Sequence, residues 1–187
     1  MIYPQKLNSK KSNLLVRFGV LLSILVALIL ILLNRHFKPR VPWAAIANGG
    51  IIYVWIVLFY SIKKNINIAG HVLLQTLALS ALTVFIDYQL GFKAWSLDII
   101  IPVLIVIANV TMFVLTIISH KNFIKYAMYQ LVISLFSILP IVLYIENITH
   151  NKVMCIIASI ISGINLALSL VLCTRDLKET VVRKFHM

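Results

Sequence analysis

Polar side chains inside the apolar segments recur at helical spacing, and any chemistry of this chain has to come from them. In the third apolar segment they lie four, three and four residues apart: Thr76, Ser80, Thr83 and Asp87. Three later segments carry similar stripes: Asp98, Pro102, Asn109 and Thr116; Tyr126, Gln130, Ser134 and Ser137; and Ser159, Ser162 and Ser169, with Asn165 beside them. Because residues three and four apart share one helix face, the four stripes are predicted to face one another. They indicate either ordinary helix packing through small and hydroxylated residues or a polar cavity that binds a solute.

Asp87 and Asp98 are the most suggestive pair among these residues. An ionised carboxylate deep in hydrocarbon is costly and usually marks a ligand or proton site. Both residues, however, flank the short connection 88–97. At that depth the carboxylates can reach water or pair with Lys93, so a structural or interfacial role is the competing interpretation.

Catalytic and metal-binding signatures are missing from the sequence. It contains no H-E-x-x-H, G-x-S-x-G or G-x-x-x-x-G-K motif, so we expect no enzyme activity, no metal and no cofactor. A lipid-modifying enzyme would need two carboxylates or a histidine near one headgroup level, and only Asp87 and Asp98 qualify. Cys155 and Cys173 lie about 27 Å apart along a straight helix, which excludes a disulfide between them.

The elements that must position these residues are six apolar segments: 14–33, 42–62, 69–88, 99–119, 126–145 and 153–174. Crossing ~30 Å of hydrocarbon takes roughly 20 apolar residues in a helix, and these segments lack the alternation of a membrane β-strand. The apolar share of 61% exceeds the roughly 45–50% of ordinary soluble domains. We therefore predict an all-α, polytopic bundle of six transmembrane helices at 14–174, with tails at 1–13 and 175–187.

The distribution of lysine and arginine predicts the orientation in the membrane. Of the 17 basic residues, twelve fall on the side of the two termini, and basic segments resist translocation. Both termini are therefore predicted to be cytoplasmic in a multi-pass plasma-membrane protein. The opposite side carries Arg35, Lys38, Arg40, Lys93 and Lys152. The first three of these run against the rule, and an inverted first span is the alternative explanation.

The net charge of +12 would suggest a nucleic-acid partner on a soluble chain, but here the basic residues gather at helix ends. We interpret them as topology signals and as contacts to anionic lipid headgroups, and we expect no nucleic-acid partner. In the tail 175–187, Leu177, Val181 and Phe185 recur every four residues among basic side chains. This pattern is typical of a short amphipathic helix on the inner leaflet, with a frayed polar tail as the alternative.

Several short stretches carry a resemblance to a known family: 81–88, Gly91 with Phe92, 95–97, Pro102, Asn109 and 183–187. They resemble an uncharacterised family of multi-span membrane proteins from Gram-positive bacteria, a domain of unknown function, over about 13–187. The resemblance implies a bacterial plasma membrane and no assigned activity. Members often carry a zinc ribbon ahead of the first span. This chain has no cysteine before Cys155, so no role of the ribbon carries over.

Two classes of function fit these patterns. The first is a non-enzymatic accessory or sensory membrane module, which acts through helix contacts with another copy or with a partner membrane subunit. The second is a small-solute transport component with a polar midplane pocket between the third and sixth helices. A pocket requires Asn109, Gln130 and Asn165 to face a common void, whereas a contact module requires them to pair across the helix interfaces.

Overall fold

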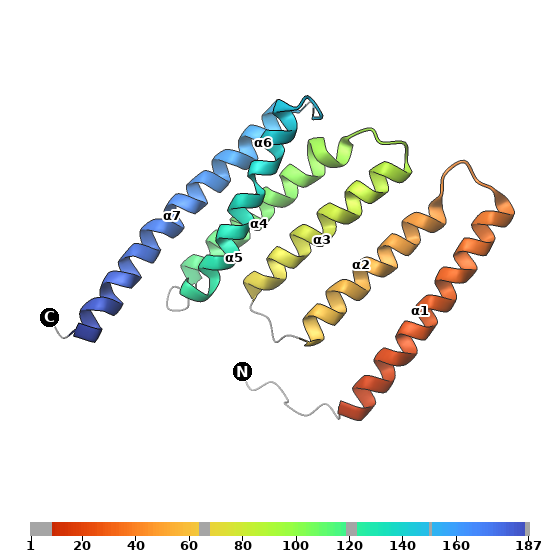
Figure 1. Cartoon of the computed structure of the whole chain (residues 1–187), viewed down its shortest axis with the longest axis horizontal. Coiled ribbons are helices and arrows are strands. Elements are labelled where there is room, and N and C mark those ends of the chain that lie inside the picture. The colour runs from red at the N-terminus through yellow and green to blue at the C-terminus, as the bar shows by residue number, and fades with distance from the viewer. Residues whose placement is uncertain (1–8, 64–67, 119–122, 150, 186–187) are drawn as a thin grey trace.

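The computed structural model describes residues 9–63, 68–118, 123–149 and 151–185, and all regular elements in these ranges are helices (Figure 1). In chain order they are α1 (Ser9–Phe37), α2 (Trp43–Lys63), α3 (Ile68–Gln89), the π-helical turn η1 (Ser96–Ile100), α4 (Ile101–Ile118), α5 (Phe123–Phe136), α6 (Ile138–Ile145) and α7 (Lys152–Phe185). The all-α prediction is thus confirmed for the described part of the chain.

The helices form a bundle with a two-helix extension. α4 packs against α3, α5 and α7, and α6 packs against α5 and α7, so these five helices make the bundle. α2 lies on the outer side of α3, and α1 packs on α2 at the far edge (Figure 1). The start of α1 and the end of α7 lie at the same end of the structure, while the connections after α1, α3 and α6 lie at the opposite end.

Four helices are long and apolar enough to cross a membrane: Val16–Phe37, Trp43–Tyr60, Ile68–Gln89 and Ser96–Ile118. They correspond to the first four predicted spans. The apolar parts of the later helices, Tyr129–Ile145 and Lys152–Leu168, are shorter within the described residues. The structure therefore supports four membrane-length helices, and the predicted count of six goes beyond it.

The first and last helices also extend past the segment boundaries predicted from the sequence. α1 begins at Ser9, inside the predicted tail 1–13, and α7 continues unbroken from Lys152 to Phe185. The backbone therefore has no break at 174, where the membrane domain was expected to end. The apolar pattern marks where the hydrophobic stretch ends, whereas backbone hydrogen bonding lets the helix itself continue.

Two prolines interrupt the helices where the sequence places them. Pro102 lacks the N–H that an α-helix would donate to the carbonyl of Asp98, and the π turn η1 immediately precedes it. Pro140 likewise cannot donate to the carbonyl of Phe136, the residue at which α5 ends. The fifth predicted span is therefore divided at Ser137 into α5 and α6. The π turn runs directly into α4, whereas α5 and α6 are separated at Ser137.

The interior of the bundle is small and polar, whereas its surface is large and apolar. Two apolar clusters link the helices, one around Met112 and Ile133 and the other around Ile105 and Ala158. Twelve buried residues in the described part are polar or charged, and long runs of leucine, isoleucine and valine are exposed. None of Val16–Phe37 in α1 is buried. A water-soluble domain shows the reverse distribution, so this surface suits an apolar solvent.

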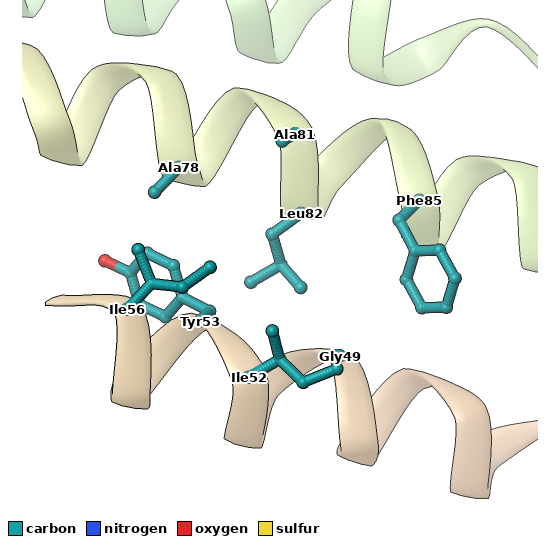
Figure 2. Close-up of a pocket in the computed structure, with 8 residues that line it drawn as sticks. All are labelled: Gly49, Ile52, Tyr53, Ile56, Ala78, Ala81, Leu82 and Phe85. Atoms are coloured by element: carbon teal, nitrogen blue, oxygen red, sulfur yellow. The ribbon is translucent and has the colours of Figure 1, made fainter. Parts of the chain in front are cut away.

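The α2–α3 interface contains an apolar cleft of about 250 Å³, lined by Gly49, Ile52, Tyr53, Ile56, Ala78, Ala81, Leu82 and Phe85. Figure 2 shows Leu82 and Phe85 of α3 pointing toward α2. The hydroxyl of Tyr53 donates a hydrogen bond to Oε1 of Gln75 and so connects the two helices. The close approach of Phe85 depends on Gly49, because a Cβ at this position would lie 2.9 Å from Phe85 Cε1.

We expect Gly49→Ala and Gly50→Ala to differ in thermal stability, although the two glycines are adjacent. Alanine is favoured over glycine in a helix by roughly 0.5–1 kcal/mol, and a Cβ at Gly50 meets nothing within 4 Å. Gly50→Ala should therefore be neutral or stabilising. Gly49→Ala should fall below it by about 1–3 kcal/mol through overpacking against Phe85. Thermal unfolding in detergent measures the difference, and equal midpoints for the two variants would contradict the contact.

Candidate functional site

The most extensive polar cluster lies where α4, α5 and α7 meet. Its three amide side chains are Asn109 on α4, Gln130 on α5 and Asn165 on α7, which are 0%, 1% and 3% exposed. Each comes from a different stripe predicted from the sequence. The helical period places each amide on the inward face of its helix, and the packing of α7 against both α4 and α5 brings the three together.

Asn165 is the centre of this amide network. Its Nδ2 donates to both the carbonyl oxygen and the side-chain oxygen of Asn109, at 3.0 Å each. Nε2 of Gln130 donates to the side-chain oxygen of Asn165 at 2.6 Å and to its carbonyl oxygen at 3.0 Å. One side chain on α7 therefore bonds directly to both α4 and α5.

The remaining polar atoms of the amide network also have partners. Nδ2 of Asn109 donates to the carbonyl oxygen of Ile105 at 2.9 Å. Oε1 of Gln130 lies 3.4 Å from Oγ1 of Thr116, whose shorter bond goes to the carbonyl of Met112 at 2.9 Å. Because buried amides are costly unless they are hydrogen-bonded, this arrangement stabilises one relative placement of the three helices.

A cleft of about 270 Å³ lies beside the amide network between α4 and α7. Its lining consists of Asn109, Val110, Phe113, Ile161, Ile164, Asn165 and Leu168. The two asparagines are bonded to each other, and the other lining residues are apolar. The cleft therefore offers hydrocarbon-like surface to an occupant, with the amide polar groups already engaged.

A second polar contact joins α7 to the junction of α5 and α6. Oγ of Ser137 donates to Oγ of Ser162 at 2.6 Å, and Oγ of Ser162 lies 3.3 Å from the carbonyl oxygen of Ser134. Ser137 sits at the helix break that precedes Pro140. The same carbonyl accepts a bond from Oγ of Ser137 at 2.5 Å, so Ser137 and Ser162 together meet a carbonyl in the last turn of α5, next to the helix break.

The stripe on α3 does not join the amide network. Oγ1 of Thr76 donates to the carbonyl of Val72 at 2.8 Å, and Oγ1 of Thr83 donates to the carbonyl of Ser80 at 3.0 Å. Both bonds stay within the helix, as is common for threonine in apolar helices. Ser80 and Ser134 are buried, and their Oγ atoms have no hydrogen-bond partner in the structure. These residues act mainly as small packing groups.

Asp87 serves a different purpose, which is to close the connection between α3 and η1. Its carboxylate is fully buried and accepts three hydrogen bonds: from Lys93 N at 2.9 Å, Ser96 N at 3.2 Å and Ser96 Oγ at 2.9 Å. The connection needs this anchor because Phe92 and Ala94 adopt positive φ angles of 45° and 61°, which non-glycine residues rarely do. The carboxylate thus offsets local backbone strain.

Asp98 is half-buried in the first turn of η1, where its backbone N–H bonds to the carbonyl of Ala94 at 2.8 Å. Lys93 meets Asp87 through its backbone N–H, whereas the sequence suggested its ammonium group. Ser96, the other partner of Asp87, is missing from the predicted stripes. The sequence signal that could have indicated the role of Ser96 is a serine at the start of a helix, shortly after a turn.

Metal ligands do not gather anywhere in the described ranges, which hold no group of three or more histidine, cysteine, aspartate or glutamate side chains. Cys155 is buried, and its Sγ lies 3.9 Å from Oγ1 of Thr149. The side chains of Cys173 and of the predicted amphipathic tail lie outside the part of the structure that is described. The polar groups described above, which are the amide network, the Ser137–Ser162 contact and Asp87, connect helices and close one loop.

Comparison with known proteins identifies a family for the chain but assigns no activity to it. A family of unknown function, DUF6320, matches residues 3–187. No curated protein and no solved structure matches the chain. The Gram-positive origin implied by the sequence resemblance remains a prediction.

Proposed function

Because the chain belongs to DUF6320, a family whose description assigns no activity, we propose its function from the geometry: a non-enzymatic membrane module that acts through helix contacts. One observation carries the proposal. The amides of Asn109, Gln130 and Asn165 pair with one another across α4, α5 and α7. Such pairing favours a fixed helix assembly over a solvated pocket.

The apolar exterior supports placing this module in a membrane. α1 has no buried residue along Val16–Phe37 and contacts chiefly α2, so in water it would expose a large apolar surface. Hydrocarbon solvates such a surface without cost, while the helical backbone satisfies its own polar groups. A plasma membrane with anionic headgroups is the partner that we propose for this surface.

Six spans remain our proposal for the number of crossings. α5 and α6 have 14 and 8 residues, and with Ser137 they extend about 35 Å at about 1.5 Å per residue. That length suffices for the ~30 Å hydrocarbon layer. α7 has 34 residues and reaches beyond a single crossing. Its last turns would carry Arg175, Lys178, Arg183 and Lys184 into the cytoplasm, with both termini on that side.

The module is proposed to bind a second copy or a partner membrane subunit and to act as an accessory or sensory component. The exposed apolar faces of α1 and α7 are the surfaces available for that contact. Small-solute transport is the second candidate, and the cleft of about 270 Å³ beside Asn109 and Asn165 favours it. Ligand pockets generally measure about 300–1,000 Å³ and offer free polar groups, so we rank transport second.

Cysteine labelling tests the proposed topology. In a background with Cys155→Ser and Cys173→Ser, we expect Val41→Cys, Leu90→Cys and Glu146→Cys to react with a membrane-impermeant maleimide on intact cells. All three positions are exposed in connections at one end of the structure. Reporters fused to each terminus should stay protected until the cells are opened. Labelling of Leu90→Cys and Glu146→Cys without Val41→Cys would instead mean that α2 and α3 do not both cross, as an inverted first span in an otherwise unchanged topology requires.

Native mass spectrometry of gently extracted protein separates the two candidate functions. We expect a complex with a second copy or with another membrane subunit, and Asn165→Leu should weaken that complex if helix placement sets the contact surface. A monomer that retains a small solute, and loses it in an Ile164→Trp variant that fills the cleft, would contradict the contact module and support transport.

A further inference from the structure

The corner between α1 and α2 concentrates positive charge without a carboxylate partner. Arg35, Lys38 and Arg40 lie within six residues and are exposed, as is His36. Within the described ranges, no acidic side chain forms a salt bridge with any of the three. Figure 1 shows this corner at the edge of the structure, away from the connection that follows α6. Its charge is therefore open to a ligand from outside the chain.

Two exposed apolar residues beside these cations indicate how deep the corner would lie in a membrane. Phe37 is 70% exposed and Val41 is 44% exposed; Phe37 lies between His36 and Lys38, and Val41 directly follows Arg40. Exposed apolar and basic side chains in alternation are typical of a segment at the boundary between acyl chains and headgroups. The long stems of lysine and arginine can reach outward from there to the headgroups.

The backbone holds a cation at a position that favours glycine. Lys38 N–H bonds to the carbonyl oxygen of Asn34 at 3.0 Å, and the φ angle of Lys38 is 44°. A residue in this left-handed conformation commonly ends a helix, and glycine fits it with least strain. The chain tolerates this strain and carries a lysine there, between Arg35 and Arg40 in the sequence.

We propose that this corner, defined by Arg35, Lys38 and Arg40, is a binding site for the phosphate of an anionic phospholipid headgroup. The proposal rests on the membrane placement proposed above. Guanidinium groups match the planar arrangement of two phosphate oxygens, and an ammonium group adds a further point of charge. Because α1 contacts chiefly α2, the other sides of α1 are open, and lipid can approach the corner from there. The site would fix the outermost helix pair to the lipid matrix.

The test is lipid binding to the detergent-extracted full chain, measured by native mass spectrometry with phosphatidylglycerol and phosphatidylcholine as probes. We expect a preference for phosphatidylglycerol that falls tenfold or more in the triple variant Arg35→Gln, Lys38→Gln, Arg40→Gln, since one basic residue near a headgroup changes affinity about fivefold. The matched control is Lys93→Gln with Lys152→Gln, two exposed cations at the same end, which should stay within twofold of the parent.

The variant Lys38→Gly separates a loss of lipid binding from a loss of folding. Glycine suits the positive φ angle, so this variant should be at least as heat-stable as the parent while binding phosphatidylglycerol several-fold more weakly. Equal losses in the triple variant and the control, or no preference between the two lipids, would overturn the site. Displacement of the lipid by millimolar inorganic phosphate would assign the corner to free phosphate instead. The labelling experiment tests membrane placement separately, so the two proposals can fail independently.

Discussion

Asn165→Leu is expected to lower the free energy of unfolding by about 2–4 kcal/mol. Leucine has the same branched arrangement of side-chain heavy atoms as asparagine, so the main loss is polar. Asn109 loses the donor to both of its oxygens, and Nε2 of Gln130 loses its 2.6 Å acceptor. Interhelical hydrogen bonds in membranes contribute about 0.6–1.7 kcal/mol each, and a buried group left without a partner costs about 1–3 kcal/mol. Titration with a denaturing detergent measures the change.

Thr111→Val supplies the matched control for this experiment. Oγ1 of Thr111 bonds only to the carbonyl of Ile107 in its own helix, at 2.7 Å, on an exposed face of α4. Its loss should change the stability by less than about 0.5 kcal/mol, as for other surface substitutions. If Asn165→Leu has no larger effect than Thr111→Val, the amide network does not hold the helices together.

A double-mutant cycle shows whether Asn109 and Asn165 act as a unit. Asn109→Leu alone should cost less than Asn165→Leu, because Nδ2 of Asn165 keeps the carbonyl oxygen of residue 109 and Oδ1 of Asn165 keeps its bond from Gln130. The double variant should then cost less than the sum of the two, with a coupling of about 1 kcal/mol or more. Additive losses would indicate that the two asparagines stabilise the bundle independently.

The sequence predicts which helix faces carry these amides, because the helical period determines which residues share a face, but it leaves open whether they pair or line a pocket. Asn109, Gln130 and Asn165 were each placed on an inward stripe, and they meet in the structure. The central position of Asn165 was not predictable, since it depends on how α7 sits relative to α4 and α5. Periodicity specifies which face points inward but carries no information about the axial offset between neighbouring helices.

The α3 stripe shows the opposite outcome. Thr76 and Thr83 have the right spacing, yet their hydroxyls bond to carbonyls in their own helix. A hydroxyl has this local option in any helix, whereas an amide has a larger polar surface to satisfy and reaches further. Spacing alone therefore overstates the role of serine and threonine in a predicted polar site.

The division of the fifth segment was only partly predictable. Pro140 predicts a missing bond to the carbonyl of Phe136, and α5 ends there. The apolar pattern, however, runs through the break, so composition alone indicates one continuous span. The loop around Asp87 was harder still to predict, because the positive φ angles at Phe92 and Ala94 occur at residues that rarely adopt them.

Asp87→Ala is expected to release the connection between α3 and η1 and to destabilise the chain by about 2–5 kcal/mol. The substitution leaves the N–H groups of Lys93 and Ser96 without their acceptor, and each buried orphan donor costs about 1–3 kcal/mol. Asp87→Asn should fall between this variant and the parent, because its amide keeps one acceptor oxygen but directs N–H toward a donor.

Local labelling distinguishes this release from general unfolding. Ala94 is 8% exposed, so an Ala94→Cys probe, in a background with Cys155→Ser and Cys173→Ser, should react slowly with a maleimide when Asp87 is present. Adding Asp87→Ala should accelerate the reaction tenfold or more under conditions in which the chain stays folded. Adding Glu146→Ala should not, because this carboxylate is exposed at the same end of the structure. Equal rates in all three backgrounds would mean that Asp87 does not close the loop, and the suggestion of a ligand or proton site at Asp87 and Asp98 would regain its force.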